Sequence, residues 1–177
     1  MILGMTTATF TLLHVLISLV GIASGLIVMY GFLASKRLDR WTALFLSTTI
    51  ATSLTGFAFS NEHITPGIVV GILSLVVLAI TLVARYGLHM SGAWRWIYVV
   101  TASVALYFNV FVFVVQSFEK VSALKALAPT QKEPPFAIAQ LLVLALFVVL
   151  TAFAVKRFHP AGASAETSKT TVSKKAA

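Results

Sequence analysis

Four polar side chains stand inside long apolar stretches of this sequence, and they are His14, Asn109, Gln116 and Gln140. An imidazole or an amide is costly to bury among apolar groups unless a partner faces it. We therefore expect these side chains to point into the protein, where they hydrogen-bond to a neighbouring helix or to a ligand. The polar segments next to the same stretches supply four further candidate ligand-binding residues, namely Glu62, His63, Gln131 and Glu133.

These residue types favour binding over catalysis. A haem inside a helical bundle needs two facing histidines, and we expect His63 in a turn and His89 and His159 on the opposite side from His14. The sequence has no His-Glu-x-x-His motif, no carboxylate inside its apolar stretches and no cysteine, which excludes thiolate catalysis and cysteine metal sites. We predict no catalytic residue, no metal site and no cofactor. One alternative stays open: a quinone head group that hydrogen-bonds to one of the four buried polar side chains beside Phe111 and Phe113.

The composition is that of a membrane protein. Of the 177 residues, 59% are hydrophobic and only 10% are charged, whereas soluble domains carry about a quarter charged residues. The principal partner is therefore the lipid bilayer. A net charge of +8 would suit nucleic acid, but the lysines and arginines stand in short clusters beside apolar stretches, as topology signals do. We predict no nucleic-acid partner.

The apolar stretches predict an all-α bundle of five transmembrane helices within residues 1–158. A helix needs about 20 apolar residues to cross roughly 30 Å of hydrocarbon. Stretches near that length lie at residues 10–33, 41–59, 66–85, 96–118 and 136–155. The segment 159–177 has too little apolar content to fold, and we predict a disordered basic tail there.

Small residues indicate where these helices approach one another. Gly21 and Gly25 share one face of the first helix, a spacing that permits close packing within the bundle or an oligomer contact. The second helix is rich in serine and threonine, whose hydroxyl groups can bond to the backbone of their own helix. On the fourth helix a stripe of small or polar residues predicts the inward face, and its members include Tyr98, Ala102, Ala105, Asn109 and Gln116.

The distribution of positive charge predicts the orientation. Ten of the 13 lysines and arginines fall in the segments after the first, third and fifth helices, and cytoplasmic segments are the ones enriched in these residues. We therefore predict an extracytoplasmic N-terminus and a cytoplasmic C-terminus. Trp and Tyr residues gather at the predicted inner boundary, as expected at lipid headgroups.

In this orientation the polar candidates gather in the outer half of the bundle. We expect them to form an extracytoplasmic mouth, built by spans 10–33, 96–118 and 136–155 with the loop 119–135. The first interpretation is a non-enzymatic accessory subunit or small-ligand binder that acts through this mouth, with a protein partner at the extracytoplasmic face. The second is a redox or quinone-interacting membrane protein, and the third is a small transporter or channel component.

Two segments carry a resemblance to a known group. One runs from Leu124 to Phe136 and contains Leu-Ala-Pro-Thr-Gln followed by Glu-Pro-Pro-Phe, and the other is Gly-Ala-Trp-Arg-Trp-Ile-Tyr-Val at residues 92–99. In these segments the chain resembles a group of small bacterial inner-membrane proteins described only as hypothetical multi-spanning proteins. The resemblance covers residues 10–158 and implies a bacterial inner membrane, but it implies no activity.

Overall fold

The computed structural model describes residues 4–59 and 66–160, and within these residues every regular element is helical. The prediction of an all-α fold is confirmed. Among the described residues, four helices are long and apolar enough to cross a membrane: Thr7–Leu33, Gly67–Gly87, Trp94–Lys120 and Pro134–Arg157. The elements in chain order are α1 (Thr7–Leu33), α2 (Asp39–Phe57), α3 (Pro66–Leu82), the π-helical turn η1 (Val83–Gly87), α4 (Trp94–Lys120), α5 (Ser122–Leu127) and α6 (Pro134–Arg157).

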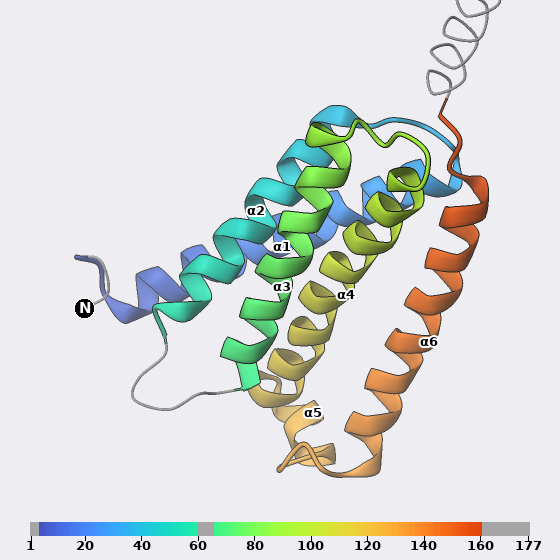
Figure 1. Cartoon of the computed structure of the whole chain (residues 1–177). Coiled ribbons are helices and arrows are strands. Elements are labelled where there is room, and N and C mark those ends of the chain that lie inside the picture. Colours follow the sequence, from blue (N-terminus) through green and yellow to red (C-terminus); the bar gives the residue numbers. More distant parts are fainter. Residues whose placement is uncertain (1–3, 60–65, 161–177) are drawn as a thin grey trace, which may run out of the picture.

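Helix α2 corresponds to the predicted span 41–59 but is not among the four most apolar helices. Its sequence contains seven serine and threonine residues and begins with a charged pair, Asp39 and Arg40. It nevertheless packs along α1 on one side and α3 on the other. The multi-pass helical bundle is therefore supported by four helices, with α2 inside the same assembly (Figure 1).

Helix α4 is the centre of the bundle, since it contacts α1, α3, α5 and α6. Its buried face carries Tyr98, Ala102, Ala105 and Leu106, each at most 2% exposed. This is the inward stripe that the sequence predicts. The stripe does not extend to its outer end, because Gln116 is exposed.

The two glycines of α1 pack inside the chain. A Cβ atom on Gly25 would lie 2.5 Å from Leu106 Cδ1 and 2.9 Å from the ring of Phe45, and one on Gly21 would lie 3.5 Å from Asn109 Nδ2. Only glycine lets α1 approach α2 and α4 this closely. Gly21 and Gly25 thus pack against other helices of the same chain. An oligomer contact through this face stays a prediction.

The two ends of the bundle differ (Figure 1). We call one the α5 end, where α5 and the following loop join α4 to α6. We call the other the basic end, where the loops 34–38 and 88–93 meet residues 158–160. There the rings of Phe32, Tyr98 and Phe158 pack together, with Phe32 and Phe158 centred 5.0 Å apart. The backbone N–H of His159 donates to Ser35 Oγ at 2.8 Å.

The start of the predicted tail therefore packs on the body. His159 makes the hydrogen bond just described, and Pro160 is buried. The remainder of that tail, residues 161–177, lies outside the described residues.

Candidate functional site

His14 joins α1 to α2. Its Nδ1 lies 2.8 Å from Thr55 Oγ1, and its ring packs edge-on against Phe59. The Thr55 hydroxyl already donates to the carbonyl of Ala51 at 2.7 Å. Nδ1 is consequently the donor in the bond to Thr55, which fixes the tautomer. The imidazole acts here as a contact between two helices.

Asn109 joins α4 to α2 in the middle of the bundle. Its Nδ2 donates to Thr49 Oγ1 at 3.0 Å. Gly21 of α1 supplies the space beside both groups, because a side chain there would touch each of them. Interhelical bonds of this kind stabilise membrane bundles by about 0.6 to 2 kcal/mol each.

The glutamines lie nearer the α5 end. Gln140 Nε2 on α6 donates to the carbonyl of Phe111 on α4 at 3.3 Å, and Gln131 Nε2 donates to the carbonyl of Val115 at 3.2 Å. Within the described residues the buried Oε1 of Gln140 has no hydrogen-bond partner. Gln116 is exposed. Gln140 and Gln131 therefore link α6 and the loop before it to α4.

Glu133 organises the turn before α6. Its carboxylate accepts the Thr130 hydroxyl at 2.8 Å, the Thr130 N–H at 3.2 Å and the Lys132 N–H at 3.0 Å. Desolvation raises the pKa of this carboxyl, but the hydrogen bonds that it accepts, from Thr130 and Lys132 among others, together outweigh desolvation and hold the pKa below its ordinary value. The other two candidates from the sequence, Glu62 and His63, lie outside the described residues.

The residues of the predicted mouth thus contact different partners at different places in the bundle. His14 and Asn109 both face α2, but on threonines six positions apart, and Gln140 faces α4. In the described ranges no hydrogen bond joins any two of the predicted site residues. The same ranges contain no group of three His, Cys, Asp or Glu side chains that could hold a metal ion.

The sequence analysis did not predict a polar network that the structure shows at the basic end. Arg85, in the π-helical turn, is only 5% exposed. Its Nη1 donates to Tyr98 Oη at 2.8 Å and its Nη2 contacts the carboxylate of Asp39. Tyr98 Oη lies 3.5 Å from Thr42 Oγ1, whose own proton goes to the carbonyl of Leu38. A chain of hydrogen bonds therefore runs from the buried guanidinium to the start of α2.

The sequence held one signal for this network. Asp39 is the only aspartate of the chain, and Arg85 ends an apolar stretch. The sequence analysis places Tyr98 on the inward face of its helix but predicts no partner for it. The structure supplies one, because Arg85 is buried and bonded to Tyr98.

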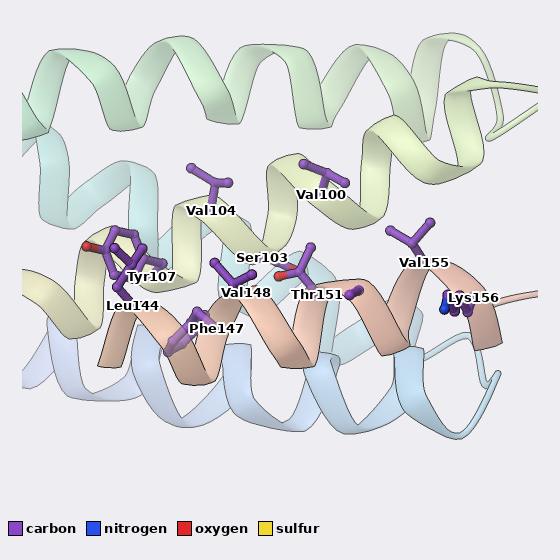
Figure 2. Close-up of a pocket in the computed structure, with 11 residues that line it drawn as sticks. Val100, Ser103, Val104, Tyr107, Leu144, Phe147, Val148, Thr151, Val155 and Lys156 are labelled. Atoms are coloured by element: carbon purple, nitrogen blue, oxygen red, sulfur yellow. The ribbon is translucent and has the colours of Figure 1, made fainter. Parts of the chain in front are cut away.

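Two hollows lie away from the predicted mouth. One is an apolar groove of about 500 Å³ between α4 and α6. Figure 2 shows its lining, with Val100, Val104 and Tyr107 on α4 and Leu144, Val148, Thr151 and Lys156 on α6. The other, of about 410 Å³, lies at the basic end against Arg85.

Comparison with known proteins returns no relationship. No family model matches the chain, and no curated protein or solved structure matches it.

Proposed function

We propose that the protein is a non-enzymatic membrane protein that binds a small amphipathic ligand from the bilayer in the groove between α4 and α6. The observation that carries the proposal is this groove, whose walls are apolar along most of their length and charged at one end. It lies nearer the basic end than the mouth that the sequence predicts. Three polar side chains of that mouth, His14, Asn109 and Gln140, instead make contacts between helices.

The dimensions of the groove suit an extended apolar chain. Its α6 wall runs from Leu144 to Lys156, which is roughly 18 Å of helix at 1.5 Å per residue. That length covers the full hydrocarbon depth of one leaflet, which is about 15 Å, half of the roughly 30 Å core of a bilayer. An acyl chain could therefore lie along α6 within a single leaflet.

The polar groups of the groove suit an acidic head at one end. Lys156 stands at the basic end of the groove, next to Val155 (Figure 2). Ser103 contributes little to a ligand, because it is buried and its hydroxyl donates to the carbonyl of Val99 at 2.7 Å. We therefore infer a single-chain acidic amphiphile, such as a fatty acid, with its carboxylate on Lys156.

A quinone is the second candidate. The ring of Tyr107 lies 5.7 Å from that of Phe147, and both residues line the groove. A quinone ring could stack in this aromatic corner, with the Tyr107 hydroxyl as the donor to its carbonyl. The proposed donor is then Tyr107, in place of the four side chains that the sequence analysis considered, namely His14, Asn109, Gln116 and Gln140.

Groove-filling variants test the proposal. Val148 lines the groove and is 60% exposed, while Leu142, on the same helix, is 66% exposed and is not among the lining residues. In Val148→Trp the indole should occupy the groove and abolish ligand retention, whereas Leu142→Trp should retain it. Retention is measured by mass spectrometry of the organic extract of purified protein.

Mass spectrometry of the same extract also identifies the chemical class of the ligand. A fatty acid whose retention falls in Lys156→Gln but not in Arg157→Gln supports the acidic amphiphile, and a quinone that is lost in Tyr107→Phe supports the second candidate. An extract of the wild-type protein that holds neither, or equal retention in the two Trp variants, overturns the proposed function.

We further propose that all five long helices cross a bacterial inner membrane, with the N-terminus outside and the C-terminus in the cytoplasm. The excess of Lys and Arg at the basic end supports this orientation, since cytoplasmic segments are rich in these residues. Five crossings place the two termini on opposite sides, whereas four place them on the same side. Reporter fusions at both ends that are active in the same compartment would contradict the five-span arrangement.

A further inference from the structure

We propose that the hollow at the basic end is a binding site for a phosphate group. It lies between the start of α2 and the segment that follows α3, and it is independent of the groove between α4 and α6. Its charged lining residues are Arg37, Asp39, Arg40 and Arg85, with His89 beside them.

The charges of this lining do not balance. Asp39 is the one carboxylate among the lining residues, and three guanidinium groups line the same hollow. Arg37 Nε lies 3.5 Å from Asp39 Oδ1, and Arg85 Nη2 contacts the same oxygen. One carboxylate oxygen is thus shared between two cations, and the lining keeps an excess of two positive charges with His89 neutral. An anion of one to two negative charges would complete the site.

Arg85 makes this excess a fixed feature of the fold. Tyr98 and Asp39 hold two of its nitrogens, and its guanidinium carbon lies 5.1 Å and 5.4 Å from the ring centres of Tyr98 and Tyr86. Its Nε is buried and has no hydrogen-bond partner in the described part of the chain. Because this atom is out of reach of solvent, Arg85 contributes its positive charge to the hollow rather than its Nε–H.

The backbone around the hollow is also unusual. Arg85 lies in a π-helical turn. Such turns are rare in proteins as a whole, but those that occur are often found at functional sites. His89 and Met90 both adopt left-handed backbone conformations, with φ of 49° and 57°. The N–H of Met90 donates to the carbonyl of Ala84 at 2.9 Å, which folds the segment back on the turn. This costly conformation brings His89 to the wall of the hollow.

Phosphate fits these groups better than a carboxylate does. Planar guanidinium groups bind phosphate oxygens in pairs, and a phosphate offers enough oxygens for Arg37, Arg40 and Arg85 together. The phosphate group could belong to an anionic phospholipid or to a soluble phosphate ester. Exposed Trp41 and Tyr86 lie at this end of the bundle and are suited to a headgroup boundary, so both sources need testing.

The test uses the full chain in nanodiscs, in two arms. In the first, inorganic phosphate is titrated against protein in zwitterionic phosphatidylcholine discs and binding heat is measured. In the second, the protein is placed in discs of mixed phosphatidylglycerol and phosphatidylcholine, and the lipid that it retains is identified by native mass spectrometry. Binding of inorganic phosphate identifies a soluble ester as the natural class, and selective retention of phosphatidylglycerol identifies the lipid.

Matched variants decide whether the hollow is responsible. Arg40→Gln and Arg37→Gln remove charges that line the hollow, and both side chains are exposed, so the fold should persist. Each should weaken binding by about fivefold or more, as expected for one lost charge-assisted hydrogen bond. Lys36→Gln removes an exposed charge from the same loop that does not line the hollow, and it should leave binding unchanged. No binding in either arm, or equal losses in Lys36→Gln and Arg40→Gln, would overturn the proposal.

Discussion

Replacing Gly25 by alanine should destabilise the bundle, because the added methyl group has no space. Its carbon would lie 2.5 Å from Leu106 Cδ1 and 2.9 Å from two ring carbons of Phe45. Both neighbours are about 1% exposed, so neither can turn away into solvent. Either α1 moves away from α2 and α4, or the two buried side chains leave their preferred rotamers.

The size of the effect follows from two opposing terms. Overpacking of a dense core costs about 1 to 3 kcal/mol, and the better helix propensity of alanine returns about 1 kcal/mol. We expect a net loss of up to about 2 kcal/mol in the free energy of unfolding relative to the wild type, and a loss of about 1 to 3 kcal/mol relative to a glycine-to-alanine change that meets no clash. For a chain of this length each kcal/mol lowers Tm by about 2 to 4 °C.

The matched control is Gly56→Ala in α2. A Cβ atom there would meet only His14 Cε1 at 3.8 Å, which is an ordinary contact. Its Tm should therefore equal or slightly exceed that of the wild type. Both variants are measured by thermal unfolding in the same detergent. A Gly25→Ala protein as stable as the Gly56→Ala protein would refute the packing of α1 described above.

Three further predictions concern hydrogen bonds and ion pairs. A double-mutant cycle on Asn109→Ala and Thr49→Ala should give a coupling of about 0.6 kcal/mol and no more than about 1.7; zero coupling would mean that their bond contributes nothing to stability. Because the pKa of Glu133 lies below its ordinary 4.5, its hydrogen bonds to Thr130 are complete above that pH and disappear as pH falls through the lowered pKa. The protection of the Thr130 amide against hydrogen exchange should follow this course, and in Glu133→Gln, whose amide oxygen accepts but does not titrate, the protection should be weaker and independent of pH. Asp39→Asn should cost about 1 to 3 kcal/mol in chemical unfolding, since it leaves a buried guanidinium without its counter-charge, and an unchanged midpoint would contradict the ion pair.

Much of the fold follows from the apolar pattern of the sequence. The predicted segments 10–33, 66–85, 96–118 and 136–155 each fall on a helix that is apolar enough to cross a membrane. The boundaries differ because capping groups are local. Helix α1 begins at Thr7, where the Thr6 hydroxyl accepts the N–H of Thr9, and α6 begins at Pro134, directly after Glu133. Periodicity alone does not contain these local bonds.

The candidate site was less predictable, because the partners of polar side chains come from other helices. The sequence correctly marks His14 and Asn109 as side chains that need a partner, and each has one on α2. It does not give the rotation of each helix, so it groups them with Gln116, which is exposed. The ion pair of Arg85 with Asp39 joins residues that are 46 positions apart in the sequence. No local sequence pattern predicts a pair with that separation.

Helix α2 is the element whose low hydropathy agrees least with its packed position in the structure. Its hydroxyl groups lower its mean hydropathy, yet several of them donate to carbonyls of the same helix, as Thr48 does to Leu44 and Thr55 does to Ala51. The protons are thereby satisfied within the helix, and the oxygens keep lone pairs for donors on neighbouring helices. His14 uses such an oxygen on Thr55. A helix of this kind is polar by composition but exposes few unsatisfied groups, so its place between α1 and α3 depends on the completeness of these hydrogen bonds rather than on its content of apolar residues.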